Sequence, residues 1–146
     1  MDQRLYLGYF QLPSLLSGPS LTYALLVPRQ YVAVEAQAMA IKATGTSSGS
    51  ILDALNLSLR AGPMLRLGHR DDTGRGLTGD LRLLAVANFL SLLAGGSSGV
   101  FPSVAAEAEA TYWPSASYGF SLRLQTDLIF AGWFLPVIGI SAGVAF

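Results

Sequence analysis

The last ten residues of this chain, 137–146, alternate between apolar side chains and very small ones. From residue 138 onward the even positions are Ile, Ile, Ala, Val and Phe, and the intervening positions are Gly, Ser, Gly and Ala. Successive side chains of a β-strand point to opposite faces, so this segment has one apolar face and one face of minimal size. A transmembrane barrel strand needs this pattern, because lipid lies on one side of it and a crowded interior on the other.

Four further stretches have the same two-residue period. In 31–41 and 55–67, apolar residues of one parity alternate with polar or charged residues of the other, and the same holds for 106–112 and 118–127. No heptad or 3.6-residue period fits these stretches, so they predict half-buried strands. Segments rich in Gly, Pro, Ser and Asp separate them and predict turns and loops.

The segments together predict an all-β fold, an antiparallel up-and-down transmembrane β-barrel of eight strands in a single domain, 1–146. The expected strands are about 3–12, 21–28, 30–43, 51–69, 80–94, 104–113, 117–131 and 135–146. An even number of strands places both termini on the same side of a membrane. We expect Gly62 and Pro63 to form a local bulge in one long strand, because a turn there would give nine segments.

One segment leaves its secondary structure open. Residues 81–93 are apolar on both faces, Asp80 is a residue type that caps helices, and Gly95-Gly96 would end a helix. A short apolar run of this kind fits a buried strand or a helix. We treat it as a strand because it completes the even number, and keep the helix as the alternative.

The composition favours a membrane environment. Hydrophobic residues make up 51% of the 146 residues and charged residues only 12%, about half the share usual in soluble domains. The net charge is zero and cysteine is absent, so nothing favours a nucleic-acid partner, a disulfide framework or a thiolate metal site. No cofactor is expected. The first residues lack the pattern of a secretory signal, so we interpret the chain as a mature or a designed sequence.

Eight charged residues inside the expected strands take the parity opposite the apolar face. A charge facing lipid at the bilayer midplane would cost about 2–4 kcal/mol, whereas charges inside a closed barrel can pair with each other. We therefore expect a filled, salt-bridged interior without an open pore. The eight residues of this expected lumen network are Glu35, Arg60, Arg66, Arg82, Glu107, Glu109, Arg123 and Asp127.

Aromatic residues gather near the ends of the expected strands, as they do in the girdles at the two membrane interfaces. They are Tyr9, Phe10, Tyr112, Trp113, Tyr118, Phe120, Phe130, Trp133 and Phe134.

Two other architectures are alternatives to a transmembrane barrel. A soluble, lipocalin-like barrel would turn the apolar faces inward, which parity alone allows, but its exterior would need far more charge than this chain has. A helical membrane protein is the other: residues 128–146 carry no charge and are long enough to span a bilayer. That architecture would leave the alternating segments unexplained.

In its pattern the whole chain resembles the small eight-stranded outer-membrane β-barrels, the OmpA- and OmpX-like proteins. The most specific element is the C-terminal strand, with Phe146 as the terminal aromatic and Val144 two residues before it; Ser141 stands where the family often has Gly. The resemblance implies insertion into a bacterial outer membrane, a lipid bilayer as surroundings, recognition of the C-terminal strand by the barrel-assembly machinery, and a monomer.

The sequence contains little that favours catalysis. His69, the single histidine, precedes Arg70, Asp71 and Asp72 in a charged stretch, and a His beside a Ser at a barrel rim is what an outer-membrane lipid acyl-hydrolase would need. No Ser lies beside His69 in a recognisable motif, so we favour a solvated histidine. We expect no enzyme but a structural or interaction barrel, with a lipid-modifying enzyme and a narrow channel as alternatives.

Overall fold

The fold is given by a computed structural model that describes residues 1–12, 16–43, 53–93, 96–130 and 134–146. It contains one short 3₁₀ turn, η1 (Pro28–Gln30). The strands are β1 (Asp2–Leu12), β2 (Leu16–Val27), β3 (Val32–Ala43), β4 (Ala54–Arg70), β5 (Gly76–Leu92), β6 (Ser98–Trp113), β7 (Gly119–Phe130) and β8 (Phe134–Ala145).

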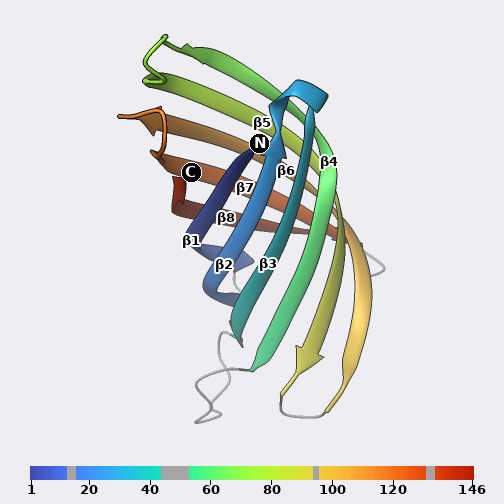
Figure 1. Cartoon of the computed structure of the whole chain (residues 1–146). Coiled ribbons are helices and arrows are strands. Elements are labelled where there is room, and N and C mark those ends of the chain that lie inside the picture. Colours follow the sequence, from blue (N-terminus) through green and yellow to red (C-terminus); the bar gives the residue numbers. More distant parts are fainter. Residues whose placement is uncertain (13–15, 44–52, 94–95, 131–133) are drawn as a thin grey trace.

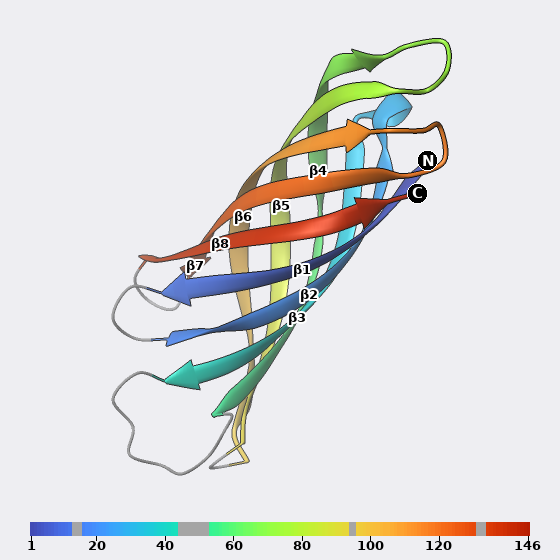
Figure 2. The same ribbon diagram turned by 90° about the vertical axis from the view of Figure 1, so that its left-hand side faces the viewer.

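The strands form one closed antiparallel barrel. Each strand pairs with the next along the chain, and β1 pairs with β8 to close the sheet. Figure 1 shows the strands tilted relative to the long axis of the barrel, and Figure 2 shows both termini at the same end. At that end Gln3 and Phe146 exchange two backbone hydrogen bonds, each with an N···O distance of 2.9 Å. The expected eight-stranded up-and-down barrel is confirmed.

Three strands begin four or more residues earlier than the sequence predicts. β2 begins at Leu16 instead of 21, β5 at Gly76 instead of 80, and β6 at Ser98 instead of 104. Gly, Pro and Ser in these segments favoured loops, but neighbouring strands hold them in the ladder. Gly18 illustrates the reason, because a Cβ atom there would lie 1.8 Å from the carbonyl oxygen of Ala40. Because residue 18 has no side chain, the backbones of β2 and β3 can approach closely at this point of the sheet.

β4 runs unbroken through Gly62 and Pro63, as expected, but without a bulge. Arg60 pairs with Val86 and Met64 with Arg82, so the three residues between them on β4 match three on β5 and none is inserted. The prediction of a bulge is therefore wrong. A Cβ on Gly62 would lie 2.1 Å from the carbonyl oxygen of Leu83, so the absence of a side chain lets the strand pass this point in register.

Residues 81–93 lie in β5 and the turn after it, and the helical alternative is wrong. Leu84 and Val86 point into the barrel and pack with Leu26, Ala33 and Met64 in a buried cluster. Leu81 and Leu83 point outward. This part of the strand is apolar on both faces because one face contacts a local apolar core and the other lies on the outside.

The helical membrane alternative for 128–146 is also wrong, because this range contains the end of β7 and all of β8. Among the described residues, no helix is long and apolar enough to cross a bilayer.

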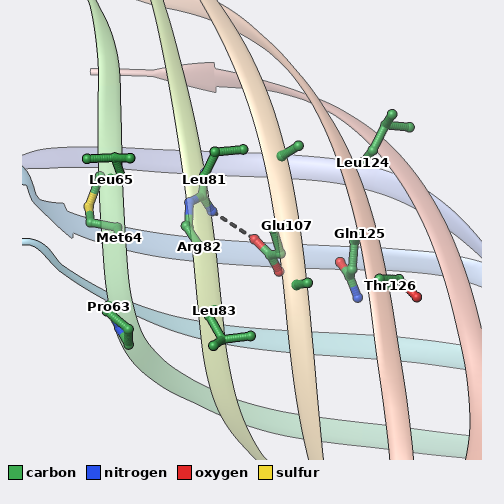
Figure 3. A pocket seen from close by; sticks show the side chains of 12 residues that line it. Pro63, Met64, Leu65, Leu81, Arg82, Leu83, Glu107, Leu124, Gln125 and Thr126 are labelled. Atoms are coloured by element: carbon green, nitrogen blue, oxygen red, sulfur yellow. Dashed lines mark hydrogen bonds and ion pairs between the residues drawn. The ribbon is translucent and has the colours of Figure 1, made fainter.

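The outside of the barrel is apolar and the inside is charged. In Figure 3, Leu81 and Arg82 are neighbours on β5; Leu81 is exposed on the outer surface and Arg82 is buried inside. At the outward positions of the described strands, Lys42 at the end of β3 is the one Asp, Glu, Lys or Arg. This orientation is opposite to that of a soluble lipocalin-like barrel, whose outer face must interact with water.

The aromatic residues do not all take the outward positions expected of girdles. Tyr9, Tyr112, Tyr118 and Phe120 are exposed on the outside. Phe10 and Trp113 have the opposite parity and are buried in the interior, at 4% and 1% exposure, which corrects the expectation for both. The side chains of Phe130, Trp133 and Phe134 lie outside the described part of the structure.

Candidate functional site: the charged barrel interior

The inward positions of six strands place arginines and carboxylates in the interior. We call this set the interior charge network; it contains five arginines and five carboxylates. They are Arg4 on β1, Glu35 on β3, Arg60 and Arg66 on β4, Asp80 and Arg82 on β5, Glu107 and Glu109 on β6, and Arg123 and Asp127 on β7. All eight residues of the expected lumen network belong to it. Arg66 is half-buried, and the others are at most 6% exposed.

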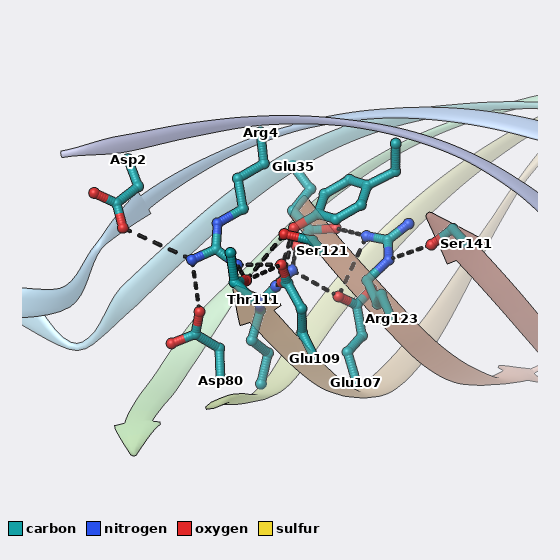
Figure 4. A network of polar contacts seen from close by, with 12 residues as sticks. Asp2, Arg4, Glu35, Asp80, Glu107, Glu109, Thr111, Ser121, Arg123 and Ser141 are labelled. Atoms are coloured by element: carbon teal, nitrogen blue, oxygen red, sulfur yellow. Dashed lines mark hydrogen bonds and ion pairs between the residues drawn. The ribbon is translucent and has the colours of Figure 1, made fainter. Parts of the chain in front are cut away.

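The centre of the network joins β3, β5, β6 and β7 (Figure 4). Arg82 Nη1 lies 2.9 Å from Glu107 Oε2 and also pairs with Glu35. Arg123 Nη1 lies 3.0 Å from Glu35 Oε2 and 3.4 Å from Glu107 Oε2. Arg123 also donates through Nε to Ser141 Oγ, at 2.9 Å. Each arginine therefore contacts both carboxylates.

A second part of the network lies around Arg60. Its Nη2 is 2.7 Å from Asp127 Oδ2, and its Nη1 is 3.1 Å from Glu107 Oε1. Arg60 also donates to the amide oxygen of Gln37. Glu107 thus connects Arg60 to the central pairs, so that one set of contacts is continuous through the middle of the barrel.

The third part of the network lies nearer the chain termini. Glu109 pairs with Arg4 and Arg82 and accepts a hydrogen bond from Tyr6 Oη at 2.7 Å. Asp80 lies 2.8 Å from Arg4 Nη2 and 2.7 Å from Arg66 Nε.

Sequence reasoning missed Arg4, Asp80 and Tyr6. The signal was present, since Arg4 and Tyr6 share the inward parity of β1, and Asp80 shares the parity of Arg82 on β5. Asp80 is the first residue of the expected strand 80–94, and β5 in fact begins four residues before it.

Trp113 lies in the interior at the end of the barrel that carries the termini. Its Nε1 donates to Thr78 Oγ1 at 3.0 Å, and the guanidinium carbon of Arg70 lies 3.2 Å from the centre of its ring. A cation above an indole face is attracted by the quadrupole of the ring. The indole therefore extends the polar contacts of the interior toward this end.

Several of the ion pairs join strands that are not neighbours in the sheet. Arg4 and Glu109 link β1 to β6, Arg60 and Asp127 link β4 to β7, and Arg123 and Glu35 link β7 to β3. In a closed order of eight strands, β3 and β7 are opposite each other. These side chains therefore extend across the lumen. In chemical terms the site is a set of mutually neutralised charges, because a buried charge without a partner is costly.

His69 and the acidic residues after it do not form a catalytic set. His69 is exposed near the end of β4, at an outward position. Asp71, in the β4–β5 turn, accepts hydrogen bonds from Thr73 Oγ1 at 2.6 Å and from the backbone N–H groups of Thr73 and Arg75. The Thr73 hydroxyl and these N–H groups lower the pKa of Asp71. Among the described residues, no cluster of His, Asp and Glu has the arrangement of a metal site.

The two residues of the expected assembly signal lie on the outer surface, at the seam where β8 pairs with β1. Val144 is 42% exposed and pairs with Leu5 on β1 and Phe120 on β7. Phe146 is 52% exposed and follows the end of β8.

Comparisons with known proteins bear on the fold alone. The sequence matches no family model and no curated protein. The N-terminal β-barrel domain of Pseudomonas aeruginosa OprF aligns over 99% of this chain and 97% of its own, with a TM-score of 0.59 and 14% identity. Neisserial surface protein A aligns over 99% of this chain and 93% of its own, with a TM-score of 0.56 and 12% identity. This chain therefore has the fold of the small eight-stranded outer-membrane β-barrels.

Proposed function

We propose that this chain is an integral barrel of a bacterial outer membrane, with a structural or interaction role and an interior closed to bulk solute. The apolar outer surface supports the membrane environment. Large apolar side chains such as Leu59, Leu83 and Leu124 are more than half exposed on three different strands. An exposed apolar surface that surrounds a barrel is stable in lipid and a liability in water.

The interior charge network is the observation that supports a closed lumen. Arg60, Arg82 and Arg123 reach carboxylates on other strands and are at most 3% exposed. An eight-stranded barrel is just wide enough for side chains to fill. Water and ions crossing this level would have to separate buried ion pairs, which costs several kcal/mol.

Planar-bilayer recordings test this proposal. The purified chain should insert without producing large, stable openings, and its insertion should be verified by the heat-dependent mobility of the folded barrel on gels. Stable openings in the parent chain would contradict a closed interior. An Arg60→Ala, Arg123→Ala double variant that still folds should raise the baseline conductance, because it removes two of the groups that cross the lumen.

The function would then depend on the connections between strands and on the outer surface. Apart from the ten residues between β3 and β4, these connections are short: β1 ends at Leu12 and β2 begins at Leu16, and Pro28–Gln30 nearly fill the space between β2 and β3. Short connections favour a compact scaffold over an extended adhesin. We further propose that the chain is a monomer and that the assembly machinery recognises β8 through Val144 and Phe146. Replacing Phe146 by Ser should slow assembly in cells while refolding of the purified chain in detergent is retained.

A lipid-modifying role for His69 remains the second candidate, on the observation that this side chain is exposed at an outward position near a strand end. Lipid deacylation by the parent chain and its loss in His69→Ala would favour that candidate; no activity in the parent removes it.

A further inference from the structure

The interior becomes apolar toward the end of the barrel that lies away from the termini. There the inward residues form an apolar cluster of Phe10, Met39, Ile41, Ala54 and Val137, contributed by four strands. These side chains do not fill the space between them: they line a cavity of about 260 Å³ inside the barrel. We call it the apolar cup. An apolar cavity of roughly 150 Å³ takes up benzene, so this volume fits about ten carbon atoms.

The floor of the apolar cup is polar. It is lined by Asn56, Asn88 and Asp127. Asn88 donates through Nδ2 to Ser103 Oγ at 2.7 Å and to the carbonyl oxygen of Phe101 at 3.2 Å, so its Oδ1 must be an acceptor. Asn56 Nδ2 donates to that Oδ1 at 3.1 Å.

These contacts fix the orientation of the Asn56 amide and leave its oxygen without a hydrogen bond. Asn56 is 6% exposed, and among the described residues no group donates to its Oδ1. A buried acceptor without a donor is unfavourable, because it has lost its hydrogen bonds to water. Because Asn56 lines the floor of the apolar cup, a hydrogen-bond donor bound there would satisfy this oxygen.

The occupant follows from the walls and the floor together. We propose that the apolar cup binds a neutral single-chain amphiphile, an alkyl chain of about eight to ten carbons ending in a hydroxyl group that donates to Asn56 Oδ1. A carboxylate is disfavoured, because it has no proton to donate to this oxygen and would lie near the carboxylate of Asp127. The proposal depends on the closed interior, since Asp127 is held at the floor by its ion pair with Arg60.

The binding experiment uses the full chain in deuterated detergent with ¹³C-labelled Met and Ile methyl groups, and 1-octanol as the probe. The methyl groups of Met39 and Ile41 line the apolar cup, whereas Ile140 is 52% exposed on the outer surface. Met39 and Ile41 should show saturable shifts and nuclear Overhauser effects to octanol, and Ile140 only a linear response to alcohol in the micelle. Unchanged Met39 and Ile41 signals, at concentrations that shift Ile140, overturn the proposal.

A matched probe tests the hydrogen bond without altering the protein. Heptyl methyl ether has as many heavy atoms as 1-octanol but no proton to donate, so it should bind about tenfold more weakly. Equal affinity of the two probes would overturn the hydroxyl class.

Two variants of β4 test the location. Ala54→Phe fills the apolar cup and should abolish the saturable response, whereas Ala61→Phe places the same side chain on the outer surface and should leave it unchanged. Persistent octanol binding in folded Ala54→Phe overturns the assignment. Conductance of the parent chain is measured separately, so an open pore and an empty cup give different results.

Discussion

At the scale of single residues, the barrel depends on buried charges that are paired with one another. Glu107 contacts three arginines, Arg60, Arg82 and Arg123, and each of these contacts a second carboxylate as well. Removing one partner of a buried pair leaves an uncompensated charge, and this costs more than the pair itself contributes to stability. The network is therefore sensitive to single substitutions.

Arg60→Met should lower the free energy of unfolding by about 3–5 kcal/mol, because Asp127 and Glu107 each lose a buried cation. Urea titration of the refolded chain in phospholipid vesicles measures the change. Arg75→Met, in the exposed β4–β5 turn, is the control and should change stability by less than about 0.5 kcal/mol. Equal stability of the two variants would contradict a structural role for the network.

The β4–β5 turn contains a pH-dependent contact that can be isolated. The pKa of Asp71 is lowered first by the Thr73 hydroxyl. A lowered carboxyl pKa stabilises the turn above the ordinary pKa of Asp, and this stabilisation is lost as the pH falls through the lowered value. Thr73→Val should therefore raise the pKa of Asp71 toward its ordinary value, as measured by NMR titration of the carboxyl carbon. An unchanged titration would exclude the hydroxyl as the main cause.

At the scale of the strand, the face on which a residue lies, outward or inward, decides which substitutions its position tolerates. Leu124→Arg, at an exposed position in the middle of β7, should lower the free energy of unfolding in vesicles by about 2–4 kcal/mol. Leu77→Arg, equally outward but next to the start of β5, should cost about 0–1 kcal/mol, because the cost falls toward the interface. Vesicle unfolding of the two variants distinguishes a lipid-facing surface from a water-facing one, on which both would be tolerated.

Close packing between strands gives a second prediction at this scale. Gly62→Ala should destabilise the barrel by about 1–3 kcal/mol, because its Cβ would lie 2.1 Å from a carbonyl oxygen of β5. In Gly79→Ala the nearest atom would be 3.7 Å away, an ordinary contact. That variant is the matched control, and heat-dependent gel mobility with urea titration compares the two.

The sequence predicted the faces of the strands better than their ends. Alternation is visible in the sequence because lipid and lumen select different residue types, and so the positions of Glu35, Arg60 and Arg123 were read correctly as inward. The starts of β2 and β6 were not, because Gly18 and Pro102 favour loops locally and only the neighbouring strands hold them in a ladder. Pairing between strands cannot be recognised from the residues of one segment alone.

The apolar cup was not predicted for a related reason. Inward Met39 and Ile41 look in the sequence like any apolar residues of a strand, and only the closed barrel shows that they lie near Phe10 and Val137. The orientation of the Asn56 amide depends on Asn88, Phe101 and Ser103, which belong to two other strands.

At the scale of the whole molecule, the alternation of strands fixes which connections share a side of the membrane. Ser115, between β6 and β7, lies on the side of the termini, and Ser97, between β5 and β6, lies on the other. Because the chain has no cysteine, Ser115→Cys and Ser97→Cys give single labelling sites. In cells, a membrane-impermeant maleimide should label one and not the other. Labelling of both, or of neither, would contradict a single transmembrane orientation.

The seam between β1 and β8 gives the molecule an all-or-none character. Its hydrogen bonds join residues from opposite ends of the chain, such as Gln3 and Phe146, and pairings of this kind form slowly because so much chain must be ordered first. Proteolytic loss of β8 would open the barrel along its length and leave the edges of β1 and β7 unpaired. Unpaired strand edges pair readily with other chains. Damage at one end of the polypeptide would thus convert a closed barrel into an open sheet that promotes aggregation.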